Sequence, residues 1–510
     1  TLEMGKTIFL LSFLVFYSYT LAQVSHTQGD WVKRKNTASH QGFLFSDSSK
    51  VFSIDFHNNR FSGKQALYTN VFDKKSGIFL ESVLLATMDG KDQKSQLKEV
   101  FSLRESFYTV STMNPKTESA SVTIHKVDIL GNVSQSLQID LQSHGYTNDS
   151  EFKIITDNAE TVFMVAQNIP QTESKKQRLI IECYDDNLFL KWRRTVEFPD
   201  KSKQFVLSDF NFDGENKITF TGQNIVDLYQ PDLQISNLKQ NTYFLFQYNY
   251  DKDQLQEIEL DLNQRFIIEL KIKTSDSSII VCGIYSKTKS FEPQGIFNLL
   301  LDEKFRLKSN NLHDFTEDDL KMLINSQKRK SKKNKFELQL HSVLLFDDGE
   351  FMLLTEEFQK EWDVANNREI DGNNYTETFI YGNILHFKFD QYGQWEKSGV
   401  ITKRQTSVND DGVYSSFSAA KSNTKNIVIL FNDNPKNIEN GNSGSPVATA
   451  GQKTFLRSVQ ITQSGVQTTK VITSSSRFKR ITPTKSSQLL DGKTYLLSEK
   501  RHKMSLIIVE

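Results

Sequence analysis

The fold of this chain is decided by two neighbouring stretches, FVLSDFNFDGENKITFTG (205–222) and TYFLFQYNYDKDQLQEIEL (242–260). Each reads as two short strands around a tight polar turn. Apolar residues alternate at Phe244, Phe246 and Tyr248, and Asp213-Gly214 is a typical hairpin turn. Residues 205–260 therefore predict one four-stranded antiparallel sheet.

The same unit recurs along the chain, at first strands about 52 to 76 residues apart. These strands are expected to start near Gly42, Lys98, Glu151, Lys203, Gln264, Glu337, Val413 and Lys485. Four-stranded units at this period are typical of β-propeller blades. The last unit has three strands, and an orphan apolar segment, Trp31-Val32, precedes the first. We therefore predict an all-β propeller of about eight blades, closed by an N-terminal strand that joins the last blade. Seven blades, or a stack of separate β-sandwiches, are the alternatives.

Composition excludes several classes of protein. The 510 residues include 62 Lys+Arg and 62 Asp+Glu, so no basic field favours nucleic acid. With 38 Phe the chain can bury a core, and 2 Cys, 23 Gly and 8 Pro are too few for disulfide-scaffold or collagen-like classes. A mean hydropathy of −0.48 with one apolar stretch excludes a polytopic membrane protein, and we expect no transmembrane span.

The N-terminus resembles a secretory signal peptide. Lys6 precedes a ten-residue apolar run, Ile8 to Tyr17, and Thr20-Leu21-Ala22 offers small residues at positions −3 and −1 of a cleavage site. We expect a signal peptide at 1–22 and a single propeller domain at 23–510, exported to the periplasm or the exterior. Two apolar strand-like runs hold Cys183 and Cys282, which we interpret as buried free thiols, with a disulfide as the alternative.

The later blades carry long polar insertions. Residues 315–327 predict a helix with Thr316 as its N-cap, followed by a basic run, 328–335, that includes Lys328, Arg329 and Lys330. Trp362 lies in the polar stretch EEFQKEWDVANN and is expected to be exposed. We predict a partner-binding surface formed by 315–335, 362–375 and 434–451, provided that all three are connections on one face.

Two patterns could support catalysis. Acidic residues bracket the hairpin at 347–357, and Glu350 and Glu356 are candidates for an acid pair near the propeller axis. GNSGSP (441–446) is similar to the nucleophile loop of glutamyl-endopeptidase-type serine proteases, but His40 lies about 400 residues upstream, far outside the usual span of that fold. We therefore interpret 441–446 as a Gly/Ser/Asn loop.

One pattern could bind calcium. Asp209, Asn211 and Asp213 have the D-x-N-x-D-G spacing of a calcium loop, but Phe220 stands where an EF-hand needs its final glutamate. An ordinary Asp-Gly hairpin is the simpler interpretation. The nine His residues show no metal-ligand spacing, so no cofactor is expected beyond this candidate calcium loop.

Residues 347–437 resemble a family of uncharacterised secreted β-propeller proteins widespread in the Bacteroidetes. The matching residues are Asp348-Gly349, Glu356, Gly382, Ile384, Trp395, Lys403-Arg404-Gln405, Asp411-Gly412, Ser415-Ser416, Asn432-Asp433 and Asn437. The resemblance implies fold and location and no established activity.

The sequence thus favours a non-catalytic, secreted propeller that acts as a binding scaffold at the bacterial cell envelope. Its expected partner is an envelope protein or a glycan, and it is expected to be monomeric by itself. The alternative is a glycan-active hydrolase or lyase that uses axial carboxylates. Two carboxylates within about 5–10 Å of each other would support the enzyme.

Overall fold

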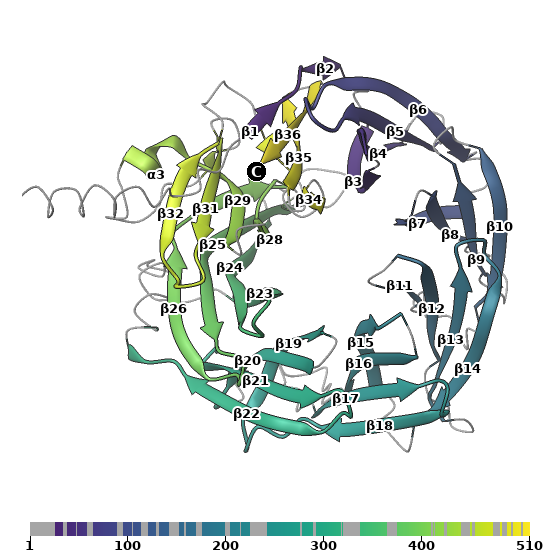
Figure 1. Cartoon of the computed structure of the whole chain (residues 1–510). Coiled ribbons are helices and arrows are strands. Elements are labelled where there is room, and N and C mark those ends of the chain that lie inside the picture. Colours follow the sequence, from purple (N-terminus) through teal and green to yellow (C-terminus); the bar gives the residue numbers. More distant parts are fainter. Residues whose placement is uncertain are drawn as a thin grey trace, which may run out of the picture.

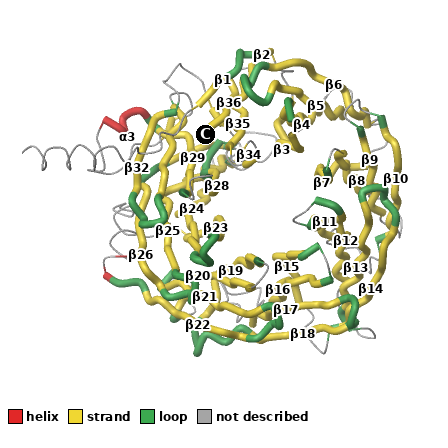
Figure 2. The backbone as a smooth tube through the Cα atoms, viewed as in Figure 1, coloured by secondary structure: helices red, strands yellow, loops and turns green. Residues whose placement is uncertain are grey.

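The computed structural model is a ring of eight sheets, antiparallel except for one short strand pair in the sixth, and strands make up most of the described chain (Figures 1 and 2). This confirms the propeller with eight blades and excludes the seven-blade and β-sandwich alternatives. The structure describes residues 26–509 except 34–37, 47, 59–64, 89–94, 105, 114–120, 129–131, 142–151, 158–159, 170–175, 199–204, 215, 225–241, 276–277, 289–291, 318, 320–336, 365–374, 410–411, 413, 423–425, 440–448, 451–453, 473–479, 482–486, 491–492 and 501–502. The predicted signal peptide, the basic run and the GNSGSP loop lie outside the described residues.

The first four blades are regular meanders. From the axis outward, blade 1 consists of β3 (Ala38–Ser46), β4 (Lys50–Asn58), β5 (Gln65–Asp73) and β6 (Phe79–Met88). Blade 2 consists of β7 (Ser95–Leu103), β8 (Ser106–Met113), β9 (Ser121–Val127) and β10 (Val133–Asp140). Blade 3 consists of β11 (Phe152–Thr156), β12 (Val162–Ile169), β13 (Arg178–Asp185) and β14 (Leu190–Glu197). Blade 4 consists of β15 (Phe205–Phe212), β16 (Lys217–Asn224), β17 (Thr242–Asn249) and β18 (Gln254–Glu259).

The later blades are more elaborate. Blade 5 consists of β19 (Phe266–Thr274), β20 (Ser278–Ser286), β21 (Gly295–Asp302) and β22 (Leu307–Asp314). Blade 6 consists of β23 (Glu337–Leu345), the long β24 (Phe351–Val364) and β25 (Tyr375–Phe389), and β26 (Trp395–Ile401), with β27 (Gln405–Val408) on β25 and β30 (Thr449–Ala450) on β27. Blade 7 consists of β28 (Ser418–Lys421), β29 (Ile427–Asp433), β31 (Phe455–Ile461) and β32 (Gln467–Val471), with α3 (Pro435–Glu439) after β29.

Blade 8 closes the ring with both ends of the chain. It consists of β33 (Arg480–Ile481), β34 (Ser487–Leu490), β35 (Lys493–Lys500) and β36 (Lys503–Val509), with β1 (His26–Gln28) and β2 (Val32–Lys33) paired to β36. The backbone amide of Gly29 donates to the carbonyl of Leu506 at 3.0 Å, and the Ser505 hydroxyl donates to the carbonyl of Gly29 at 2.6 Å. The N-terminal strands therefore supply the outer strand that the last blade lacks, as predicted, and protect its edge.

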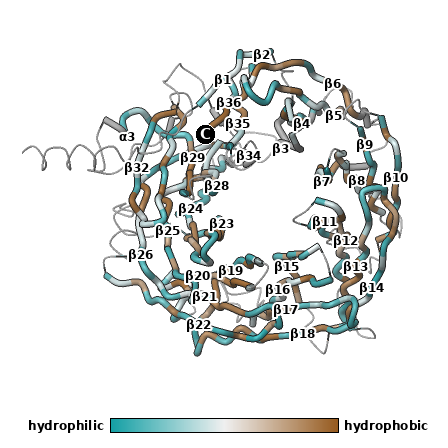
Figure 3. The backbone as a smooth tube through the Cα atoms, in the orientation of Figure 1, coloured by the Kyte–Doolittle hydropathy of each residue, from teal (hydrophilic) through white to brown (hydrophobic). Residues whose placement is uncertain are grey.

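The core lies between blades and not within one central mass. Eight buried apolar clusters correspond to the eight contacts between adjacent sheets, including that between blades 8 and 1, where Val51 and Phe72 pack against Tyr495 and Leu506. Middle strands such as β21 are buried at every position, whereas outer strands such as β14 are mostly exposed or half-buried. Figure 3 shows hydrophobic residues recurring along the strands of the ring.

A side-chain cap recurs at the turn between the third and fourth strands of blades 1 to 7. The residue at the start of the turn accepts hydrogen bonds from backbone amides two to four residues later, as in the bonds of 2.9 and 3.0 Å from Asn187 and Phe189 to Asp185. The capping residues are Asp73, Asp128, Asp185, Asn249, Asp302, Asp390 and Thr462. This repeat fixes the outer hairpin of seven blades.

The described start of the 315–327 insertion has the hydrogen bonds of a capping box. The Thr316 hydroxyl accepts from the amide of Asp319 at 3.1 Å, and the Asp319 carboxylate accepts from the amide of Thr316 at 2.9 Å. Asp319 also accepts a bond from Ser398 of β26 at 3.1 Å, which ties this start to blade 6. Residues 320–327 lie outside the described chain, so the helical insertion stays a prediction.

Candidate functional site

The three long connections of blades 5 to 7 leave the ring on the same side. In an antiparallel meander, the connections from second to third strand and from one blade to the next share one face. Residues 315–336 join blade 5 to blade 6, whereas 365–374 and 434–454 join the second to the third strand of blades 6 and 7. All three therefore start from one face, which we call the insertion face; the opposite face, with the short hairpin turns, is the turn face. The predicted composite surface requires this common face, and the surface itself stays a prediction.

A buried ion pair lies beneath the insertion face, between blades 6 and 7. Glu356 of β24 pairs with Lys403, which follows β26, and both residues are at most 3% exposed. The Ser416 hydroxyl donates a hydrogen bond to the same carboxylate at 2.5 Å, and the Lys403 ammonium also donates to Gln405 at 2.8 Å. Burial raises the pKa of Glu356 and lowers that of Lys403, while the pairing opposes both shifts.

A second buried ion pair continues this network into blade 7. Asp433, at the end of β29, pairs with Arg457 of β31 at 2.9 Å and accepts a bond from the Asn437 side chain of α3 at 2.7 Å. Asn432 donates to the carbonyl of Tyr414 and accepts from Gln405, both at 2.8 Å. The two pairs are thus joined through Gln405 and Asn432, and they fix the strand ends from which the insertions leave.

Local backbone geometry is built around the same network. A β-carbon on Gly382 would lie 2.4 Å from a Glu357 carboxylate oxygen, so this position holds glycine to admit the acid. Ser416 has φ of 67°, in the left-handed region that costs about 1–3 kcal/mol for such a residue. Its bond to Glu356 offsets part of this cost.

Most residues that carry the family resemblance gather in this network. They include Glu356, Gly382, Lys403, Gln405, Gly412, Ser416, Asn432, Asp433 and Asn437. No sequence pattern indicated their common location, and Arg457, which lies beyond the resemblance, carried no local signal of its role. Only Asp433, a charge at the end of the apolar strand IVILFND, could have suggested buried pairing.

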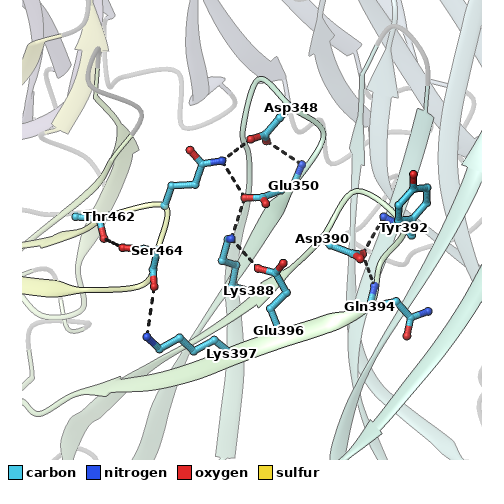
Figure 4. A network of polar contacts seen from close by, with 11 residues as sticks. Asp348, Glu350, Lys388, Asp390, Tyr392, Gln394, Glu396, Lys397, Thr462 and Ser464 are labelled. Carbon is cyan, nitrogen blue, oxygen red and sulfur yellow. Dashed lines mark hydrogen bonds and ion pairs between the residues drawn. The ribbon is translucent and has the colours of Figure 1, made fainter.

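Glu350 and Glu356 both belong to blade 6, but Glu350 lies toward the opposite face of the ring. It occupies the first hairpin turn of blade 6, on the turn face, where it pairs with Lys388 at 2.9 Å and accepts a bond from Gln463 at 3.0 Å (Figure 4). Lys388 also pairs with Glu396 at 2.6 Å, and these bonds raise its pKa against the effect of burial. Six residues of strand separate the two glutamates by about 20 Å, so the structure does not bring them together as an acid pair.

The candidate calcium residues do not converge either. Asp213 accepts bonds from the amides of Asn216 and Lys217 in its own turn, Asn211 bonds Thr274 of the next blade, and Asp209 lies at a β-bulge. This arrangement fits an Asp-Gly hairpin, with Gly214 at φ of 85°. Within the described ranges, no group of three or more His, Cys, Asp or Glu side chains is placed to hold a metal ion.

The remaining candidates are placed as follows. Trp362 lies in β24, opposite Glu377 of β25, and its side chain is outside the description. Lys328, Arg329 and Lys330 fall in the undescribed part of the 315–336 connection. Cys183 and Cys282 are buried free thiols, as predicted, and burial raises the pKa of Cys183 to about 12. In the part of the chain that is described, no helix is long and apolar enough to cross a membrane.

Comparison with known proteins finds similar solved structures but no matching family. No family model and no curated protein matches this sequence. Among solved structures, the Dos1 propeller is 10% identical, with 94% of this chain and 95% of that one covered and a TM-score of 0.46. The β-propeller domain of the Trilobed protease from Pyrococcus furiosus (8% identity, 86% and 97% covered, TM-score 0.32) and polysaccharide lyase Uly1 (10%, 81% and 89%, 0.37) are also similar. These similarities concern the fold alone.

The fold and the site together define the class of protein. It is an eight-bladed β-propeller, closed by strands from both ends of the chain, with its long connections on one face above a buried ionic network.

Proposed function

We propose that this protein is a non-catalytic, exported scaffold whose insertion face binds a partner at the bacterial cell envelope. The observation that carries the proposal is the common face of the three long connections, with two buried ion pairs fixing their strand ends. A buried ion pair is costly to desolvate and is therefore weak evidence for stability. Holding the loops in a fixed arrangement gives the chain a reason to keep these two pairs buried. Lys328, Arg329, Lys330 and Trp362 are the proposed partner contacts.

Location and family are part of the same proposal. The expected signal peptide at 1–22 would place the propeller in the periplasm or outside the cell, and the resemblance over 347–437 would place it among the secreted propellers of the Bacteroidetes. The N-terminal residue of the protein recovered from its native envelope tests this step. A mature start at Gln23 is expected, and an uncleaved chain in the cytoplasm would contradict export.

The glycan-active enzyme has no better support. Its proposed carboxylates, Glu350 and Glu356, lie on opposite faces, and each is already engaged with a lysine. We therefore propose binding without catalysis.

Crosslinked pull-down of the tagged mature protein from its native envelope tests the proposal. We expect stoichiometric recovery of one envelope protein or glycan, lost when residues 328–335 are replaced by a Gly/Ser linker or when Trp362→Ala is introduced. Tyr392→Ala is the matched control, since this residue is 66% exposed on the turn face. Recovery of the protein alone, or equal recovery with every variant, would contradict the proposal.

A further inference from the structure

A second charged arrangement lies on the strands nearest the propeller axis. Figure 1 shows β7, β11, β15, β19 and β23 side by side around the centre of the ring. Four of them, from blades 2 to 5, carry Glu99, Lys153, Asp209, Glu269 and Lys271, which we call the axial arc. The arc is distant in sequence from the insertions of blades 6 and 7.

The innermost strands are bent where this arc lies. The pairing of first and second strands shifts register at Leu97/Glu99 in blade 2, at Ser208/Asn211 in blade 4 and at Ile267/Glu269 in blade 5. Each shift is a β-bulge, which turns side chains out of the regular alternation and is frequent near binding sites. Asp209 sits inside such a bulge with φ of 49°.

The charges of the arc act on one another across blades. Desolvation raises the pKa of Glu99, Asp209 and Glu269, while Lys153 lowers those of Glu99 and Asp209, and Lys271 those of Asp209 and Glu269. Acid and base therefore alternate from Glu99 through Lys153 and Asp209 to Lys271, and Glu269 lies beside Lys271 on the same strand. Glu99, Lys153 and Asp209 are nevertheless exposed, so they are accessible groups surrounded by protein.

These groups have few partners of their own. Across the described part of the chain, the side chains of Glu99, Lys153, Asp209 and Lys271 form no hydrogen bond and no ion pair within 4 Å, and the Glu269 carboxylate accepts one bond, at 2.8 Å, from the amide of Leu340. Donors and acceptors that lie on adjacent inner strands and are not paired with each other can bond a ligand that enters between them. This differs from the buried network beneath the insertion face, whose groups are already paired.

We propose that the axial arc binds a neutral, polyhydroxylated ligand, namely a segment of an oligosaccharide. A carboxylate only accepts hydrogen bonds and an ammonium only donates them, whereas a sugar hydroxyl does both. Neighbouring hydroxyls can therefore satisfy Lys153 and Asp209, or Lys271 and Glu269, at once. A strongly charged ligand would meet repulsion from one half of the arc, because the two signs alternate. This site is independent of the proposed insertion-face function.

Affinity gel electrophoresis of the full chain tests the site, with five neutral polysaccharides as probes: laminarin, dextran, mannan, xylan and pullulan. We expect at least one to retard the protein, and Asp209→Asn with Lys271→Gln to weaken that retardation at least tenfold. Asparagine tolerates the left-handed backbone at position 209, so the double variant should keep its fold. Circular dichroism and the melting temperature check this.

Matched variants make the outcome decisive. Glu197→Gln with Lys308→Gln removes one charge of each sign from the exposed outer strands β14 and β22, and should bind as the unaltered protein does. Replacing 328–335 should also leave polysaccharide binding intact, which separates this site from the insertion face. The proposal is overturned if none of the five probes binds, or if the folded arc variant binds as tightly as the outer-strand control.

Discussion

At the scale of single residues, the decisive feature is the pairing of charges in a site that excludes water. Glu356 and Lys403 are both shifted by burial toward their neutral forms, yet each holds the other in a network that includes Ser416. Removing one member of such a pair leaves an uncompensated buried charge. Removing both members also removes the desolvation cost of burying them.

The first prediction follows from this asymmetry. Lys403→Met should lower the free energy of unfolding by about 3–5 kcal/mol, and Glu356→Gln combined with Lys403→Met should recover most of the loss. Urea denaturation followed by tryptophan fluorescence measures both. If the free energy of unfolding of Lys403→Met stayed within about 1 kcal/mol of that of the unaltered protein, the pair would not be a buried ionic contact.

His386 gives the fold a dependence on pH. It is 1% exposed, its Nε2 lies 2.7 Å from the side-chain amide of Gln467, and burial lowers its pKa from the ordinary 6.5 to about 4. Below pH 6.5 the unfolded chain takes up a proton that the folded chain does not. The stabilisation present above 6.5 is therefore lost as the pH falls toward 4.

We expect His386 to lower the free energy of unfolding by about 1.4 kcal/mol for each unit that the pH falls between 6.5 and 4. His386→Met should reduce the slope of unfolding free energy against pH by this amount. Urea unfolding at pH 7, 6 and 5 provides the measurement. An unchanged slope in the variant would mean that His386 is protonated in the folded protein.

At the scale of elements, the sequence predicted the strands better than their contacts. Every first strand begins within five residues of its expected position, the largest difference being Ser418 against Val413, because alternation and turn residues are local signals. The bulges of the inner strands and the pairing of Glu356 with Lys403 depend on register between distant segments, which no local pattern contains. The residue that caps each outer hairpin, by contrast, is a local signal that the sequence does contain.

The outer-hairpin cap leads to a prediction about one blade. Asp185→Ala removes two backbone hydrogen bonds to a carboxylate and should destabilise the protein by about 1–3 kcal/mol. Asp186→Ala is the neighbouring control, since its side chain contacts Arg104 at 3.8 Å and accepts a bond from the Asn187 side chain at 3.2 Å but caps no backbone amide of the described chain; such surface contacts contribute at most about 1 kcal/mol. Thermal melts compare the two, and equal effects would contradict the capping role.

At the scale of the whole molecule, the ring depends on strands from the two ends of the chain. Beginning the chain at residue 34 would remove β1 and β2 and expose the edge of β36 along residues 503–509. We expect a lower melting temperature and concentration-dependent association through the free edge. Light scattering coupled to size exclusion measures the association. A monomer of unchanged stability would show that the core between blades 8 and 1 closes the ring alone.

The central claim is that the insertion face is where a partner binds, and photocrosslinking tests it most directly. A photoreactive amino acid is placed either at Lys436, exposed in α3 on the insertion face, or at Tyr392, exposed on the turn face. The protein is then irradiated in its native envelope. We predict one discrete adduct from position 436 and none from position 392. Adducts from position 392 alone would place the partner on the opposite face and contradict the account.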